Sequence, residues 1–228
     1  MIEFKNVSKR YWKHQALTDV TFTLPSGKII GIVGENGSGK STTLKLMAGL
    51  ICPTKGTVIV NGVPMDRRMA KAVSYLSELD VYYPFTVEET IQFYASQFAD
   101  FSLERADEIA AFMKLDRKKR VKSLSKGSRG RLKMVLTLAR EAPVILMDEP
   151  FSGLDPMVRD AIVKSLISFL DIEHRTIVIT THELKEIEPL LDMAVALKEG
   201  ELIGIRDVEE LRDDENLSIV DWMKQQYE

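Results

Sequence analysis

The 228-residue chain combines 45% hydrophobic with 29% charged residues, which is ordinary for a globular protein with a sizeable core. A net charge of −3 argues against nucleic-acid binding by the protein as a whole, and a single cysteine, Cys52, excludes an internal disulfide. No apolar run approaches the roughly 18 residues that span a bilayer, and we recognise no signal peptide. We therefore expect a cytoplasmic protein whose membrane role would come through a partner.

The N-terminal segment predicts two strands, at residues 2–7 and 17–24. Apolar residues of the second strand alternate with threonines, as in a half-buried antiparallel hairpin. Tyr11 and Trp12 lie between the two strands. An aromatic pair in this place can offer a purine a stacking face, or it can cover the edge of the sheet, and the spacing leaves both interpretations open.

Residues 34–41 have the sequence GENGSGKS, between an apolar strand-like run, Ile29 to Val33, and a helical pattern from Ser41 to Leu50. A strand, a glycine-rich loop and a helix in this order define a phosphate-binding P-loop. Its glycines let the backbone wrap around a phosphate, and the N–H groups at the helix N-terminus favour negative charge. Lys40 is placed to reach the β- and γ-phosphates, and the Ser41 hydroxyl to contact Mg²⁺. The chain is therefore expected to bind a nucleoside triphosphate.

The middle of the chain predicts two further strands and then a group of helices. Residues 57–60 and 72–76 predict strands, and Asn61-Gly62 after the first is a strong hairpin signal. Three helices then interrupt the alternation of strands and helices, which indicates an inserted helical lobe. They are expected at residues 86–98 behind a capping box, at 103–115 and at 126–141.

Basic residues are concentrated in this lobe: residues 114–133 hold ten Lys or Arg against one acid, Asp116. We favour the interpretation that they form a solvated surface. The alternative is a local attraction for phosphates, which requires the third helix to face a nucleotide.

The chain returns to the sheet at residues 144–149, an apolar strand that ends in Asp148 and Glu149. Ligands of open α/β sheets bind at this end of the strands, so Asp148 is expected to help hold Mg²⁺ and Glu149 to stand near the attacking water, although such a pair can also cap a helix. Another apolar strand, residues 176–180, leads to His182. We expect this strand to be parallel to those that carry the P-loop and Glu149, which would place His182 beside the γ-phosphate. A hairpin through Glu199-Gly200 and an acidic, weakly amphipathic tail follow; the tail receives no chemical role.

These motifs, in this order, resemble the nucleotide-binding subunit of an ATP-binding cassette (ABC) transporter, over nearly the whole chain from Tyr11 to about Ile205. Many NTPases share the P-loop, but Leu124–Ser128 at the start of a helix and Ser152–Pro156 after the acidic pair are specific to this family. The resemblance implies an α/β fold: a P-loop NTPase core with a mostly parallel sheet flanked by helices, an N-terminal antiparallel β subdomain and an inserted helical lobe. It implies one ABC ATPase domain, with its catalytic core at residues 1–84 and 142–228 and a helical subdomain at 85–141.

The resemblance also implies a role for each motif residue, with ATP and Mg²⁺ as the bound groups. Tyr11 would stack on adenine, Glu149 would be the catalytic glutamate, and His182 the switch histidine. The implied catalytic residues are Lys40, Glu149 and His182, and the implied metal ligands are Ser41, Glu78 and Asp148. The implied nucleotide contacts are Tyr11, Gly34, Asn36, Gly37, Ser38, Gly39, Lys40, Ser41, Thr42, Ser125, Gly127 and Asp155.

In this family two cassettes close head to tail, so that each ATP lies between the P-loop of one subunit and the signature motif of the other. Ser125 and the Gly127 amide would then contact the γ-phosphate across the interface. The implied partners are a second ABC subunit, identical or different, and an integral membrane permease that docks near Glu78 to Phe85. No nucleic-acid partner is expected.

Two motifs depart from the family pattern, at three residues. The usual signature is Leu-Ser-Gly-Gly-Gln, but Lys126 replaces its first glycine and Ser128 its glutamine, which puts the local backbone conformation in doubt. Glu78 stands where a glutamine is usual; a carboxylate can also ligate Mg²⁺, but it adds negative charge beside Glu149 and the phosphates.

Two functions remain open at this stage. The first is an ATP-hydrolysing subunit, peripheral on the inner face of the cell membrane, that powers a separate transporter. The short chain, without an added regulatory domain after Ile205, resembles exporter-type ATPases of bacterial multidrug, antibiotic-resistance or peptide systems more than those of sugar importers. The second is a soluble ABC ATPase that drives a cluster-assembly or cell-division partner. A third interpretation, a P-loop kinase, is set aside because it explains neither Leu124–Ser128 nor Ser152–Pro156.

Overall fold

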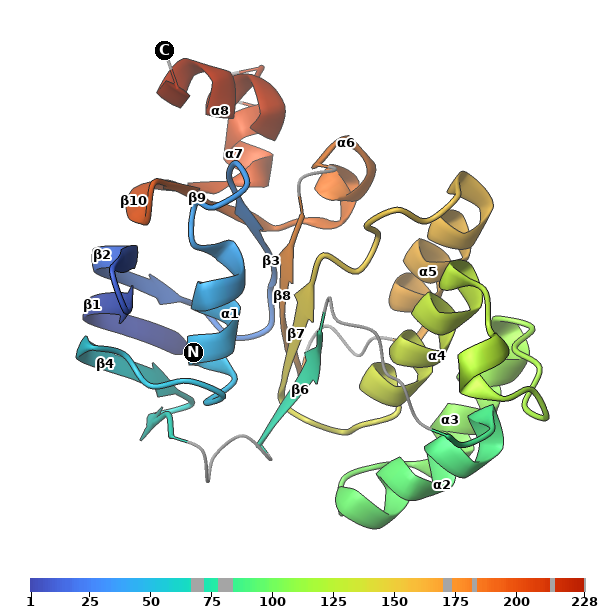
Figure 1. Cartoon of the computed structure of the whole chain (residues 1–228). Helices are drawn as coiled ribbons and strands as arrows, with labels where there is room; N and C mark the ends of the chain where they lie inside the picture. The colour runs from blue at the N-terminus through green and yellow to red at the C-terminus, as the bar shows by residue number, and fades with distance from the viewer. Residues whose placement is uncertain (67–71, 78–83, 170–173, 182–183, 214–215, 228) are drawn as a thin grey trace.

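A computed structural model describes residues 1–66, 72–77, 84–169, 174–181, 184–213 and 216–227. Its strands form two sheets, one antiparallel with the order β2-β1-β4-β5 and one mostly parallel with the order β10-β9-β3-β8-β7-β6. Helices flank the second sheet (Figure 1). This arrangement confirms the predicted α/β fold with an N-terminal antiparallel part.

The antiparallel sheet is built around the predicted N-terminal hairpin, in which β1 pairs with both β2 and β4. Its strands are longer than expected, because β1 continues to Tyr11. The predicted Asn61-Gly62 turn joins β4 to β5, and both residues have positive φ, 50° and 79°, as a tight hairpin turn requires. The strands are β1 (Ile2–Tyr11), β2 (His14–Leu24), β4 (Lys55–Val60) and β5 (Val63–Pro64).

The second sheet carries the predicted apolar strands at its centre. All five residues of each of β3, β7 and β8 are buried, which explains why these strands are continuous apolar runs without alternation. β9 and β10 add the predicted antiparallel hairpin through Glu199 and Gly200. The strands are β3 (Ile29–Val33), β6 (Val73–Leu76), β7 (Val144–Asp148), β8 (Thr176–Thr180), β9 (Met193–Lys198) and β10 (Glu201–Asp207).

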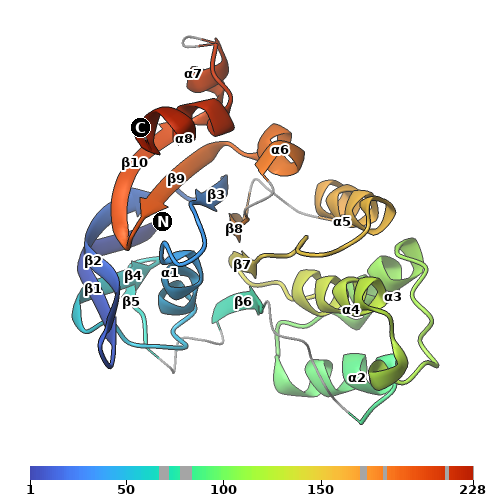
Figure 2. The ribbon, with the colours of Figure 1, turned by 45° about the horizontal axis from the view of Figure 1, so that its top comes forward.

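Helix α1 (Lys40–Met47) lies between the two sheets and shares a hydrophobic cluster with both (Figures 1 and 2). Leu44 and Met47 are fully buried in this cluster, beside Phe4 of the first sheet and Ile32 of the second. Burial of this apolar face fixes the helix that follows the P-loop against both sheets, and so fixes the loop itself.

The helices between β6 and β8 gather on the side of the second sheet away from α1 (Figure 2). The predicted capping box is present: the Thr86 hydroxyl accepts from the Glu89 N–H, and the Glu89 carboxylate accepts from the Thr86 N–H. The third predicted helix, which begins at Lys126, ends three residues earlier than expected, at Leu138. The helices are α2 (Val87–Gln97), α3 (Leu103–Phe112), α4 (Lys126–Leu138) and α5 (Pro156–Phe169), with a short 3-10 turn, Val121–Ser123, before α4. The predicted domain boundaries at residues 84/85 and 141/142 stay a prediction.

The basic segment before α4 is largely exposed to solvent, as we favoured from the sequence. Lys118, Lys119, Arg120 and Lys122 are exposed. Arg117 is half-buried, because its guanidinium forms ion pairs with Glu88 at 2.5 Å and Asp107 at 2.6 Å.

The weakly amphipathic C-terminal tail packs against β10. Trp222 is 2% exposed and packs against Gly204 of β10, where a Cβ would lie 3.2 Å from its ring. Within the described residues, no helix combines the length and the apolar character that crossing a membrane requires. The tail elements are α7 (Val208–Asp213) and α8 (Ile219–Tyr227), whereas α6 (Leu184–Ile187) and a 3-10 turn (Glu188–Leu190) precede β9.

Candidate nucleotide site

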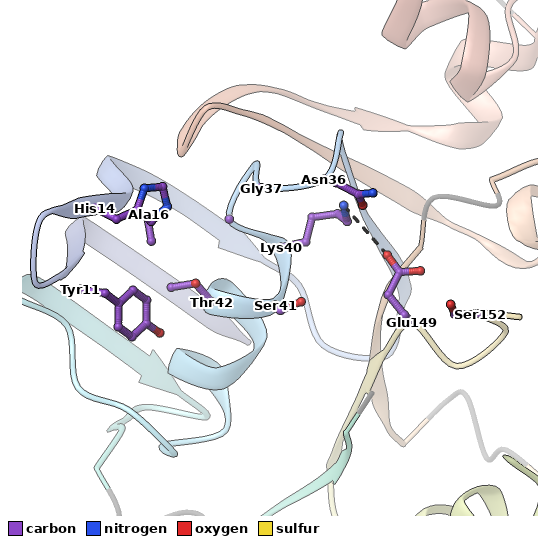
Figure 3. A pocket seen from close by; sticks show the side chains of 11 residues that line it. Tyr11, His14, Ala16, Asn36, Gly37, Lys40, Ser41, Thr42, Glu149 and Ser152 are labelled. Atoms are coloured by element: carbon purple, nitrogen blue, oxygen red, sulfur yellow. Dashed lines mark ion pairs between the residues drawn. The ribbon is translucent and has the colours of Figure 1, made fainter. Parts of the chain in front are cut away.

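A pocket of about 360 Å³ lies at the N-terminal end of α1, beside the carboxyl end of β7 (Figure 3). It opens between the tip of the β1–β2 hairpin, the P-loop and the loop that follows β7. Its lining residues are Tyr11, His14, Ala16, Asn36, Gly37, Gly39, Lys40, Ser41, Thr42, Glu149 and Ser152. The structure thus brings together predicted site residues from three separate parts of the chain.

The P-loop needs its glycines for two reasons. Gly34, Gly37 and Gly39 have φ values of 151°, 87° and 103°, which residues other than glycine rarely adopt. A Cβ on Gly34 would also collide with the Leu197 carbonyl, and one on Gly39 with the Leu17 side chain. The loop therefore packs tightly on its supports while its other face stays open to the pocket.

Lys40 lies across the mouth of the P-loop rather than in solvent, with 6% of its surface exposed. Its ammonium donates to the carbonyl oxygens of Gly34 at 2.8 Å and Glu35 at 3.0 Å. It also lies 4.0 Å from a carboxylate oxygen of Glu149, across the pocket (Figure 3). This geometry holds a positive charge at the place where a bound anion would meet it.

Asp148 is 2% exposed and accepts hydrogen bonds from three hydroxyl groups. Ser41 and Thr180 each donate to its Oδ1 at 2.9 Å, and Tyr75 donates to its Oδ2 at 3.0 Å. The Ser41 contact agrees with the expectation that both residues serve one site. Tyr75 and Thr180 were not among the predicted site residues, because only the strand order, in which β6 and β8 flank β7, brings them to this carboxylate.

Glu149 has the left-handed backbone conformation, with a φ of 48°. Its N–H donates to the Thr180 carbonyl at 3.2 Å and to the Thr180 hydroxyl at 3.0 Å. A non-glycine residue in this region is strained, and here the strand β8 stabilises it. As a result the carboxylate turns away from β7 and faces Lys40 (Figure 3).

Tyr11 lies at the pocket and Trp12 does not. Tyr11 is 40% exposed, and its ring lies near the start of α1 at Thr42 (Figure 3). The Lys9 ammonium lies 5.1 Å from the ring centroid. Trp12 is 91% exposed. Of the two aromatic residues, only Tyr11 has the position that base stacking needs.

Ser125, Gly127 and Asp155, which were also predicted as nucleotide contacts, do not line this pocket. Ser125 caps α4, because its hydroxyl accepts from the Ser128 N–H at 3.2 Å. Gly127 faces α5, where a Cβ would lie 3.0 Å from Val158. Asp155 caps α5 through a hydrogen bond from the Val158 N–H at 3.0 Å.

Two predicted site residues, Glu78 and His182, lie outside the described residues. Among the described residues no group of three or more acidic, histidine or cysteine side chains forms a metal site. The Ser41 hydroxyl and the Asp148 carboxylate nevertheless fit Mg²⁺, which is bound by few protein oxygens together with phosphates and water.

The fold and the site define a P-loop nucleoside triphosphatase: a P-loop after a central parallel strand, and an acidic pair ending the next strand but one. The family described as ABC transporter matches residues 17–152, more than half of the chain, and the chain belongs to this family. It is an ATP-binding subunit of the ABC type and an ATPase.

The relatives and solved structures agree with this assignment. The ABC transporter ATP-binding protein YtrB of Bacillus subtilis is 28% identical, over 94% of this chain and 74% of that protein. The Nod factor export ATP-binding protein I of Burkholderia orbicola is 35% identical, over 89% of this chain and 69% of that protein. An ATP-binding subunit of an ABC transporter superposes over 100% of this chain and 98% of its own, with a TM-score of 0.85 and 27% identity. A dimer of the cassette MJ0796, after hydrolysis and bound to ADP and phosphate, covers 91% of this chain and 99% of its own, with a TM-score of 0.81 and 25% identity.

Proposed function

We propose that the chain is the ATP-hydrolysing subunit of an ABC exporter whose membrane-spanning part is a separate permease. The observation that carries the proposal is the pocket itself, which joins a P-loop, an aromatic residue and a carboxylate in one cavity. The 35% identical relative named for Nod factor export supports the exporter direction. The chain would work at the inner face of the cell membrane, held there by the permease.

Each part of the pocket has a proposed role toward ATP. The P-loop amides surround the phosphates, and Lys40 leaves its carbonyl acceptors to contact the β- and γ-phosphates. Tyr11 stacks on the adenine ring. The 360 Å³ cavity between them accommodates the nucleotide.

Hydrolysis needs a base that faces the attacking water. Glu149 is proposed for this role, because its left-handed backbone directs its carboxylate into the pocket opposite Lys40. His182 is proposed to contact the γ-phosphate from the end of β8. Ser41 and Asp148, with Glu78 as a third ligand, are proposed to hold Mg²⁺, which would neutralise charge on the phosphates when bound.

The site is proposed to be completed by a second subunit. Ser125 and Gly127 lie outside the pocket of their own chain, at the N-terminus of α4, where free N–H groups favour an anion. A head-to-tail dimer brings this helix end, together with Asp155, to the nucleotide of the other subunit. The dimeric form of the MJ0796 cassette supports this arrangement.

The permease is proposed to dock near residues 78–85. The one residue of this segment with a described aromatic ring, Phe85, is half-buried, and its centroid lies 6.0 Å from that of Phe93 on α2. Phe93 is 37% exposed, so this aromatic pair offers apolar surface to a partner.

Glu149→Gln tests the ATPase part of the proposal. Removing the base should lower steady-state hydrolysis by about 10²-fold or more, while ATP binding persists and the variant accumulates as an ATP-bound dimer. Glu141→Gln is the matched control, because it makes the same change at an exposed position away from the pocket and should hydrolyse ATP normally. Near-normal hydrolysis by Glu149→Gln would remove Glu149 from the base role.

Affinity purification from membranes tests the transport part. We expect the chain to co-purify with a polytopic membrane protein. A complex with soluble proteins alone would instead favour an ATPase of the cluster-assembly or cell-division type.

A further inference from the structure

Three hydroxyl groups from three different elements donate hydrogen bonds to the Asp148 carboxylate. Thr180 ends β8, Tyr75 lies on β6, and Ser41 lies on α1. Thr180 is fully buried and Asp148 is 2% exposed. The carboxylate thus has a fixed set of donors that exclude solvent from it.

The three donors are divided between the two carboxylate oxygens. Oδ1 accepts from Ser41 and Thr180, each at 2.9 Å, whereas Oδ2 accepts from Tyr75 at 3.0 Å. The last torsion of an aspartate side chain is broad and roughly two-fold, so contacts to Oδ1 alone leave the plane of the carboxylate weakly determined. The Tyr75 hydroxyl fixes that plane from the other side.

Thr180 has a second function in the same hydrogen-bond network. Its hydroxyl donates to Asp148 Oδ1 at 2.9 Å and accepts from the Glu149 N–H at 3.0 Å. A single side chain therefore joins the carboxylate of Asp148 to the strained backbone of Glu149. Valine has the shape of threonine but neither hydrogen bond.

We propose that Tyr75 and Thr180 are positioning residues of the ATPase site, with different tasks. Tyr75 orients the Asp148 carboxylate toward the divalent cation. Thr180 orients the same carboxylate and also holds Glu149 in its left-handed conformation. The inference rests on the proposed roles of Asp148 and Glu149.

The experiment separates cation binding from turnover. Mn²⁺ is titrated into the purified chain with a non-hydrolysable ATP analogue and followed by electron paramagnetic resonance; hydrolysis is measured separately at saturating Mg²⁺. Tyr75→Phe removes one oxygen and should raise the Mn²⁺ dissociation constant by roughly 10-fold, the scale of such outer contacts to a metal ligand. Affinity for the analogue without metal should not change.

Thr180→Val should weaken Mn²⁺ binding and also lower the rate at saturating Mg²⁺ by roughly 10-fold, since Glu149 loses its hydroxyl acceptor. Thr180→Ser keeps the hydroxyl and should restore both values. The matched control is Ser74→Ala, which removes a buried hydroxyl bonded to the Thr137 carbonyl at 2.9 Å on the same strand as Tyr75. It should change stability but not Mn²⁺ affinity.

Two results would overturn the inference: Mn²⁺ affinity of Tyr75→Phe within two-fold of the wild type, or an equal loss in Ser74→Ala. Failure of Thr180→Ser to restore the rate would overturn the task assigned to Thr180. Failure of the underlying site is distinguishable, because then the wild-type chain itself would bind neither the analogue nor Mn²⁺.

Discussion

The ammonium group of Lys126 occupies the space that a Cβ on Gly153 would need. Lys126 is the first residue of α4, and Gly153, with a φ of 62°, belongs to the loop that follows Glu149. The lysine has no positive φ, so the backbone accepts a side chain where the family usually has glycine. The departure at position 126 therefore creates a contact between the signature helix and the loop after β7.

Gly153→Ala should destabilise the protein through two separate effects. A left-handed non-glycine residue costs about 1 kcal/mol, and the new methyl group must also displace the Lys126 side chain. In a Lys126→Ala background only the backbone effect remains, so the cost of Gly153→Ala should be smaller there. Urea unfolding of the four proteins of this double-mutant cycle measures the difference. An equal loss of unfolding free energy in both backgrounds would show that the Lys126 side chain moves aside without an energetic cost.

Tyr11→Ala should weaken ATP binding by about 1–3 kcal/mol if the ring stacks on adenine, by analogy with base–aromatic stacking. Tyr11→Phe keeps the ring and should bind like the wild type. Isothermal titration with ATP compares the two variants. Unchanged affinity in Tyr11→Ala would restore the interpretation that the ring covers the edge of the sheet.

The fold was predictable wherever burial dictates a pattern. The central strands β3 and β8 agree with the sequence prediction at both ends, because strands covered on both faces must be apolar throughout. The Thr86 capping box likewise follows from two residues close in sequence. The predicted ends of α4 and β1 were wrong by a few residues, because no glycine or proline directly follows either element and tertiary contacts decide where they end.

The site was predictable only where its residues are neighbours in sequence. Lys40 and Glu149 belong to local motifs, but Tyr75 lies 73 residues before Asp148, and Thr180 lies 32 residues after it. Tyr75 and Thr180 both occur in strands whose pattern indicates a buried core. Only the order of strands in the sheet shows that their hydroxyls meet one carboxylate.

Acid should remove the stabilisation that Glu88 provides. The hydrogen bond from Arg117, followed by one from Gln92, lowers the pKa of Glu88 below its ordinary value of 4.5. The ionised form is therefore favoured in the folded state, so its contribution is complete above about pH 4.5 and is lost as the pH falls through the lower, folded pKa. Glu88→Gln should lower the melting temperature at pH 7, and the difference should shrink below pH 4.5.

Glu108→Gln is the control for this pH series, because Glu108 is exposed on α3, in the same helical lobe. Scanning calorimetry from pH 3 to 8 follows both variants, with roughly one-pH-unit steps. A Glu88→Gln difference that is constant with pH would contradict the role of the ion pair with Arg117.

Ser125 combines two functions that substitution can separate. Its hydroxyl caps α4, and in the proposed dimer it contacts the γ-phosphate held by the other subunit. Ser125→Ala should lose the cap and about 1 kcal/mol of stability. Ser125→Asp keeps an oxygen acceptor for the Ser128 N–H, so its stability should equal that of the wild type, but its charge would repel the phosphates.

Contact with the γ-phosphate is tested by dimerisation in ATP, measured by light scattering in a Glu149→Gln background. Ser125→Asp should abolish the ATP-dependent dimer although the monomer is fully folded. Ser102→Asp is the matched control, because Ser102 caps α3 in the same way, accepting from the Arg105 N–H at 3.2 Å. A dimer that forms normally with Ser125→Asp would mean that the N-terminus of α4 does not face the nucleotide. Loss of the dimer in both aspartate variants would point instead to a general effect of added negative charge on this lobe.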